Sequence, residues 1–122
     1  MAGTLIYDTI EDGSGNTMPT STAIKGVAKA WVSFWGQTQG IRNSLNVSSI
    51  TRVVQGQYRI NYTTAYPDTD YAVVATSNDN GSGNGCLSIV GQILTTNVLI
   101  ITINPASLGQ YDASFVSVVI FK

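Results

Sequence analysis

The 122-residue sequence contains no histidine and a single cysteine, Cys86. Without histidine, the chain lacks the side chain that most often acts as a general base near neutral pH, and the commonest nitrogen ligand of metals. One cysteine cannot form an internal disulfide or a thiolate metal cluster, and without histidine it cannot act as a papain-type nucleophile. We therefore expect no metal centre, no cofactor and no enzymatic activity.

Charge is also scarce, because only 11% of the residues are charged whereas 43% are apolar. The six Lys and Arg residues are scattered and the net charge is −1, which disfavours nucleic-acid binding by phosphate neutralisation. No basic segment precedes an apolar stretch in the manner of a signal peptide. The apolar runs, such as VLII at 98–101, are far too short to cross a bilayer.

The first part of the chain differs in composition from the rest. TLIYDTI at 4–10 could form a short strand, but EDGSGNTMPTSTA at 11–23 is a run of turn-forming residues. We interpret residues 1–24 as a lead-in that is extended or loosely ordered. The remaining residues, 25–122, are predicted to form one compact domain.

Short β signals separated by turn residues recur along this domain. The clearest is GQYRINYTT at 56–64, where Tyr58, Ile60 and Tyr62 alternate with polar residues, and Gly56 can supply the turn of a hairpin. The other predicted strands lie within 27–35, 49–54, 71–77, 86–94, 97–103 and 112–121. Sustained helical spacing of apolar residues is missing. The pattern predicts an all-β domain, an antiparallel β-sandwich or jelly-roll-like barrel of about seven to eight short strands.

Several of these strands are apolar on both faces, although a small sheet normally has one polar face. The strand at 27–35 places Trp31 and Trp35 on the face opposite Ala30, Val32 and Phe34. Association between copies of the chain would cover the second faces, and loops or the lead-in would be the alternative cover. The residues predicted at a subunit interface are Trp31, Phe115, Val119 and Phe121.

Aromatic side chains next to flexible polar loops are suited to sugar binding, because rings offer flat apolar faces and amides supply directional hydrogen bonds. GQTQG follows Trp35, PDTD follows Tyr66, and 78–85 reads NDNGSGNG. Packing explains Trp35 and Tyr66 equally well. The predicted receptor-binding residues are Trp35, Gln37, Gln39, Tyr66, Asn78, Asp79, Asn80, Ser82 and Asn84.

The carboxylates suggest little catalysis. Asp68 and Asp70 resemble a glycosidase pair only superficially, because a proline-containing turn explains both by local backbone bonding. The oxygen-rich stretches 12–16 and 78–85 carry too few carboxylates for a high-affinity calcium site. We predict no metal at either.

From Lys29 onward, the sequence resembles a module of tail-fibre and other virion proteins of tailed bacteriophages, particularly marine and cyanobacterial phages. Five motifs carry the resemblance, in this order: KAWVSF at 29–34, IRNS at 41–44, NVSSIT at 46–51, GQYRINYTT at 56–64 and PDTDYAV at 67–73. They span about 45 residues and mostly describe framework. WGQTQ and TRVVQGQ depart from the usual pattern, and residues 78–122 follow only the general strand pattern.

The resemblance implies a tail-fibre head domain, usually a homotrimer, that contacts the host surface as part of the virion. Its partners would be copies of itself, other phage tail proteins, and a host-surface glycan or outer-membrane component. Three linked sites would turn weak sugar contacts into firm attachment. A structural virion module, such as a decoration, collar or connector, is the main alternative. A polysaccharide hydrolase of the tailspike type is disfavoured by the missing histidine and few carboxylates.

Overall fold

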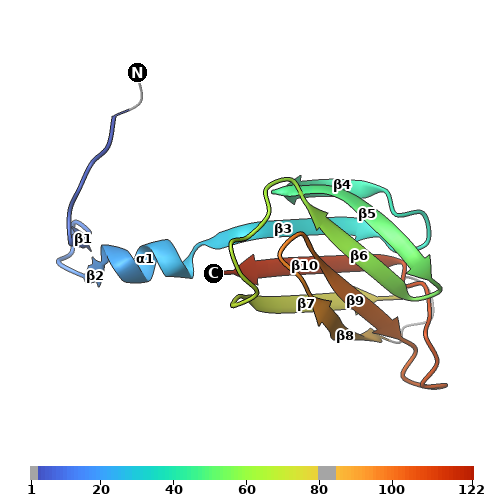
Figure 1. Cartoon of the computed structure of the whole chain (residues 1–122). Helices are drawn as coiled ribbons and strands as arrows, with labels where there is room; N and C mark the ends of the chain where they lie inside the picture. Colours follow the sequence, from blue (N-terminus) through green and yellow to red (C-terminus); the bar gives the residue numbers. More distant parts are fainter. Residues whose placement is uncertain (1–2, 80–84) are drawn as a thin grey trace.

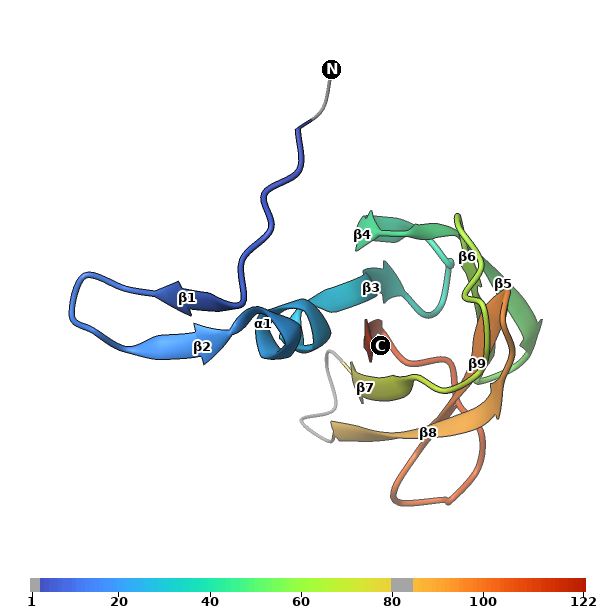
Figure 2. The ribbon, with the colours of Figure 1, turned by 60° about the vertical axis from the view of Figure 1, so that its left-hand side comes forward.

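The computed structural model describes residues 3–79 and 85–122, which form a β domain with a projecting N-terminal arm. The arm contains strands β1 (Thr9–Glu11) and β2 (Thr17–Pro19) and helix α1 (Thr20–Gly26), and it stands away from the domain in Figures 1 and 2. The strands of the domain are β3 (Ala28–Trp35), β4 (Ile41–Leu45), β5 (Val47–Val54), β6 (Gln57–Tyr62), β7 (Ala72–Asn78), β8 (Gly85–Ile93), β9 (Asn97–Ile103) and β10 (Phe115–Phe121).

The eight strands form one antiparallel sheet in the order β4-β3-β10-β7-β8-β9-β6-β5. β7 and β8 pair only at Ser77–Cys86 and Asn78–Gly85, so the sheet divides there. We call β4-β3-β10-β7 the first half-sheet and β8-β9-β6-β5 the second. The sheet curves around a common core and nearly closes where β4 runs into β5 (Figure 2). The predicted all-β antiparallel fold is confirmed, in a form between a sandwich and a barrel.

The core follows from the period-two pattern of the strands, because alternate side chains point to the same face. Tyr58 and Ile60 of β6 are completely buried, and the Tyr58 ring meets the Phe34 ring edge-on, with 5.3 Å between centroids. Ala30, Val32, Phe34, Val98, Ile100, Val116, Val118 and Ile120 complete the central layer. Both half-sheets contribute, so the core forms only when they meet.

Asn46 makes the corner at which β4 turns into β5. Its φ of 54° lies in the left-handed region, which asparagine tolerates better than most residues. Its side chain accepts the Thr64 N–H at 2.7 Å and donates to the Thr64 carbonyl at 3.2 Å. The Asn46 carbonyl also accepts the Thr63 N–H at 3.1 Å. One residue thus reverses the chain and attaches the corner to the loop after β6.

The arm has more regular structure than the sequence predicts, since a hairpin and a helix occupy part of the lead-in. The Asp12 carboxylate accepts the backbone N–H groups of Ser14 and Asn16, and the Asn16 amide. These bonds, the side-chain bond from Asn16 foremost, lower the pKa of Asp12. The carboxylate considered for a cation therefore stabilises a turn. No residue of α1 is buried, so the apolar side chains of the arm remain exposed.

Strand β4 was not predicted, because its exposed residues give no clear alternation and its pairing with β3 is a long-range property.

Within residues 3–79 and 85–122, no helix has the length and hydrophobicity needed to span a membrane.

We predict that Asn46→Ala lowers the free energy of unfolding by about 3–4 kcal/mol, since a left-handed alanine costs roughly 1–2 kcal/mol and each of the two lost side-chain hydrogen bonds about 1 kcal/mol. Asn46→Gly keeps the backbone conformation and should lose only the bond energies. Urea denaturation followed by tryptophan fluorescence measures both variants. Equal losses in the two would show that the φ of 54° is not a constraint.

Candidate functional site

The candidate recognition residues that the structure describes, except Tyr66, lie at the end of the domain opposite the arm. β3 ends there at Trp35, β7 ends at Asn78 and β10 begins at Phe115, and Phe115 pairs with both of the other two. The arm and the last strand's end lie at the other end (Figure 1). We call the end that carries Trp35, Asn78 and Phe115 the distal end. It comprises these strand termini, the turns at 36–40 and 55–56, and the loop 104–114.

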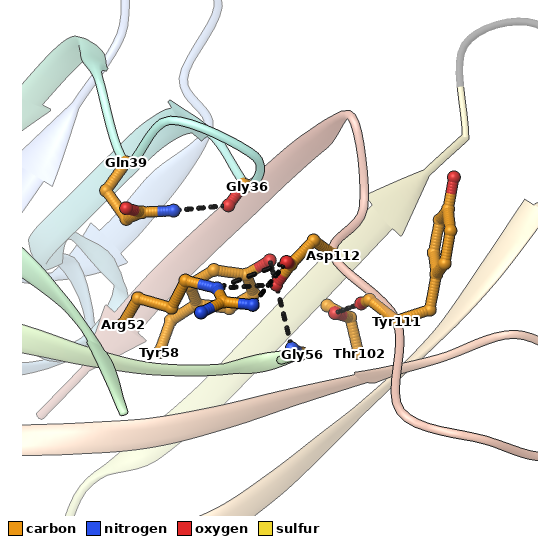
Figure 3. A network of polar contacts seen from close by, with 8 residues as sticks. All are labelled: Gly36, Gln39, Arg52, Gly56, Tyr58, Thr102, Tyr111 and Asp112. Atoms are coloured by element: carbon orange, nitrogen blue, oxygen red, sulfur yellow. Dashed lines mark hydrogen bonds and ion pairs between the residues drawn. The ribbon is translucent and has the colours of Figure 1, made fainter. Parts of the chain in front are cut away.

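A partly buried polar network around Asp112 holds the distal end together (Figure 3). The Asp112 carboxylate accepts Arg52 Nη2 at 2.7 Å, Arg52 Nε at 3.1 Å, the Gly56 N–H at 2.8 Å and the Tyr58 hydroxyl at 2.9 Å. Gly56 has a φ of 75°, which glycine adopts without strain. The carboxylate therefore joins the loop 104–114 to both strands of the β5–β6 hairpin.

The network fixes the ionisation of its members. Desolvation raises the pKa of Asp112, but the bonds from Arg52, Gly56 and Tyr58 outweigh it, so the pKa lies below its ordinary value. Burial, followed by the hydrogen bond to the carboxylate, raises the pKa of Tyr58. Asp112 is therefore an ionised acceptor and Tyr58 a protonated donor, which is the combination that a stable hydrogen-bond network needs.

A close backbone contact between Gly36 and Ala113 attaches the loop 104–114 to the end of β3. A Cβ atom on Gly36 would lie 2.2 Å from the Ala113 carbonyl oxygen, so only glycine fits. The Gly36 N–H donates to the Ser114 carbonyl at 3.3 Å. The residue after Trp35 and the residue before Phe115 are therefore held together, and so are the two rings.

Trp35 and Phe115 form an aromatic pair under a cation. Their ring centroids are 4.2 Å apart and the planes are tilted by 41°. The Arg42 guanidinium lies 5.1 Å from each ring centroid, a distance typical of a cation–π contact. Trp35 remains 41% exposed. We call Trp35, Phe115 and Arg42 the aromatic–arginine cluster.

The outer face of the first half-sheet has alternating rows, because strand register aligns like residues. One row is polar and contains Asn43, Ser33, Ser117 and Thr76. The next row towards the arm is apolar and contains Leu45, Trp31, Val119 and Val74. A shallow depression of about 280 Å³ adjoins the cluster, lined by Thr76, Ser77, Asn78, Phe115 and Ser117. The distal part of this face thus combines rings, amide and hydroxyl groups, and one cation.

The other predicted receptor residues divide by location. Gln37 is exposed beside Trp35, whereas the Gln39 amide donates to the Gly36 carbonyl at 2.6 Å and supports the turn (Figure 3). Asp79, at the end of β7, accepts the Ser114 hydroxyl at 3.3 Å. A hydrogen bond to Asp79 also raises the pKa of Tyr111. Asn80, Ser82 and Asn84 lie outside the described residues.

Tyr66 lies apart from the other predicted receptor residues. It is only 9% exposed and packs against Tyr62 and Tyr71, with 4.9 Å between centroids in each pair. The Tyr62 hydroxyl donates to the Tyr71 hydroxyl, which donates to the Leu94 carbonyl. This tyrosine cluster covers the arm-proximal end of the core. Tyr66 therefore has a packing role.

The predicted interface residues all lie on the outer face of the first half-sheet. Trp31, Val119 and Phe121 are half-buried there, and Phe115 belongs to the aromatic–arginine cluster. None of the predicted interface residues lies on β8 or β9, although the outer face of these two strands forms a second apolar surface. There Leu87 pairs with Ile103 and Ile89 with Ile101, beside Leu99. We call these five residues the aliphatic surface.

Four carboxylates of the described segments, those of Asp12, Asp68, Asp79 and Asp112, have structural partners. Asp68 forms an ion pair with Lys122 and accepts the Asp70 N–H at 2.9 Å, and the bond from Lys122 foremost lowers the pKa of Asp68. This is the turn role predicted for Asp68. Among residues 3–79 and 85–122, no three histidine, cysteine or acidic side chains are grouped to hold a metal ion.

We predict that Asp112→Asn lowers the free energy of unfolding at pH 7 by about 2 kcal/mol, the scale of hydrogen bonds to a charged group. The carboxylate stabilises the fold fully above the ordinary aspartate pKa of roughly 3.9, and this contribution disappears as pH falls through the lowered native pKa. The difference between wild type and variant should thus shrink below about pH 4. Urea titrations at several pH values measure it, with exposed Asp70→Asn as the control. A difference that stays constant down to pH 2 would contradict this role.

Comparison with known proteins supports the fold. No protein-family model matches the sequence, and no curated protein matches it. Among solved structures, the chain is similar to the phiAB6 tailspike, whose crystal structure contains three-repeated oligosaccharides of Acinetobacter baumannii surface polysaccharide. The TM-score is 0.61 with 15% sequence identity over 93% of this chain. The match covers 22% of the tailspike chain, so the likeness in fold is to a segment of that protein.

Proposed function

We propose that the chain is a receptor-binding head domain of a phage tail fibre, which attaches to a host-surface glycan through its distal end. The proposal rests on one main observation. Exposed rings, amides, hydroxyls and an arginine are concentrated at the end of the domain that points away from the projecting arm. Likeness in fold to a segment of a phage tailspike, and the tail-fibre motifs, are consistent with this role.

The distal end is built to present side chains without moving them. The Asp112 network and the close Gly36–Ala113 contact hold the turns that flank the aromatic pair. A rigid framework loses little conformational entropy when a ligand binds. A small number of contacts can therefore be enough for specific, if weak, binding. Such contacts become firm attachment when several copies bind together.

We assign this multivalency to a homotrimer assembled through the aliphatic surface. Its five side chains lack hydrogen-bonding groups, as expected of an obligate interface, whereas the outer face of the first half-sheet interleaves polar rows. The row of Trp31 and Val119, with Phe121, is the alternative contact predicted from the sequence. In our assignment, Phe115 belongs to recognition because it contacts Trp35 and Arg42.

Binding without cleavage is part of the proposal. Glycoside hydrolysis ordinarily needs two carboxyl groups that flank the scissile bond. At the distal end, Asp112 is engaged by Arg52 and Tyr58 and Asp79 contacts Ser114. A reducing-sugar assay on any polysaccharide that the protein binds should therefore detect no product.

A structural virion module is the second candidate, and the arm favours it. Leu5 and Ile6 are 80% and 89% exposed, and Ile24 and Val27 are also uncovered. Apolar groups exposed to this extent usually contact a partner. The arm is compatible with both functions, since a head domain also has to join the rest of a fibre. Glycan binding by the distal end separates the two.

We predict that the protein binds a subset of immobilised bacterial capsular polysaccharides and lipopolysaccharide O-chains. Trp35→Ala should weaken apparent binding by at least about tenfold, because loss of one aromatic contact costs at least about 1.4 kcal/mol and multivalency amplifies it. Tyr7→Ala, which removes an exposed aromatic from the arm, is the control and should bind as wild type. Absence of binding to every polysaccharide would favour the structural module.

We predict a trimer by light scattering that Ile89→Lys dissociates. Ile89 is 47% exposed in the single chain, so the substitution should spare the fold while placing a charge in the apolar contact. Val74→Lys is the matched control on the opposite half-sheet, at 53% exposure, and should leave the trimer intact. Dissociation by Val74→Lys alone would instead support the contact around Trp31.

A further inference from the structure

Arg42 is an exposed cation in contact with two aromatic rings, and among residues 3–79 and 85–122 it has no carboxylate partner. Its guanidinium lies over the Trp35 and Phe115 rings. Within residues 3–79 and 85–122, the two ion pairs join Arg52 to Asp112 and Lys122 to Asp68, so neither involves Arg42. The planar guanidinium carries its N–H donors in a rigid fork. The contacts of Arg42 within the described residues leave these donors available at the surface.

The depression that borders Phe115 of the aromatic–arginine cluster offers neutral hydrogen-bonding groups. Its lining includes Thr76, Asn78 and Ser117, and Phe115 forms part of its wall. In the described part of the chain, the side chains of Thr76, Asn78 and Ser117 have no hydrogen-bond partner. Its volume of about 280 Å³ lies at the lower limit of ligand pockets, which span roughly 300–1,000 Å³. The space suits one sugar ring.

The combination is selective in its chemistry. Hydroxyl and amide groups beside an aromatic ring suit any sugar, since the ring takes the C–H face and the polar groups take the hydroxyls. The guanidinium adds a preference, because its parallel N–H pairs match a carboxylate in a bidentate geometry. A neutral sugar has no carboxylate for these N–H groups to bind.

We propose that Arg42, Trp35, Phe115 and Asn78 form a subsite for an acidic monosaccharide of the uronic-acid type within the receptor glycan. Arg42 binds the sugar carboxylate, the exposed ring surface at the edge of the cluster packs against the sugar, and Asn78 with Ser117 and Thr76 binds its hydroxyls. The inference rests on the proposed function and specifies its ligand class.

The test is an NMR titration of the whole ¹⁵N-labelled chain with methyl β-glucuronide, methyl β-glucoside and inorganic phosphate. Methyl glucuronide should shift the Trp35 indole N–H and the Asn78 side-chain amide, with an affinity at least about tenfold above that of the glucoside, as loss of one charge-assisted pair implies. Equal affinity for the glucoside would overturn the acidic preference. Equal shifts with phosphate would reduce the subsite to a simple anion site and overturn the sugar assignment.

Variants separate binding by Arg42 from packing by Arg42. Arg42→Gln should lower glucuronide affinity to that of the glucoside, and Arg42→Lys should restore part of it. Arg59→Gln is the matched control, because Arg59 lies on the other half-sheet, where the Gln92 and Asn97 side-chain oxygens hold it. Unchanged glucuronide affinity in Arg42→Gln would overturn the proposal.

The same variants distinguish this inference from the proposed function. If Arg42→Gln binds the polysaccharide array as wild type does and Trp35→Ala does not, the receptor-binding role stands and the acidic subsite fails. If the chain binds methyl glucuronide selectively but no polysaccharide, the subsite stands and the receptor-binding role fails.

Discussion

The Asp112 carboxylate is the interaction on which the distal end depends. It joins a loop that precedes β10 to a hairpin more than fifty residues earlier, through four donor groups of Arg52, Gly56 and Tyr58. A partly buried carboxylate is stable only when its oxygens are satisfied, so the network adopts one arrangement rather than several. The next two residues of the chain lie against Gly36, and Phe115 follows. One polar contact thereby sets where the aromatic pair stands.

The two half-sheets share one core but differ in their outer faces. Inside, both contribute apolar residues in alternation, which is the requirement of packing. Outside, the first half-sheet combines rings, hydroxyls, amides and the guanidinium of Arg42, while β8 and β9 present aliphatic side chains. Few charged side chains are available to keep the outer faces soluble. The exposed apolar groups of each face therefore indicate contact with a ligand or partner. We propose that a glycan binds the mixed face and that further copies of the chain cover the aliphatic face.

Several candidate residues show why the site was only partly predictable. Trp35 and Asn78 could be nominated from composition next to polar turns, and both lie at the distal end. Tyr66 follows the same pattern, yet it is buried among tyrosines, because the loop after β6 folds back over the core. Arg42 was not predicted as a site residue, because its motif IRNS at 41–44 indicates framework and not a binding site. Its relevance depends on the register of β4, β3 and β10, which brings residues more than seventy positions apart under one guanidinium.

The sequence by itself determined the class of fold, the composition of the core and the shortage of charge, because alternation and residue type are local properties of a strand. The strands around Tyr58, Val98 and Val118 could be identified in this way. Only the tertiary structure decided which side chains become neighbours on the outer faces. It also added the corner at Asn46 and the strand β4, whose exposed residues have no periodic signal. Neighbours across a sheet depend on strand order and register, which arise from packing over the whole chain and are not encoded in any one segment.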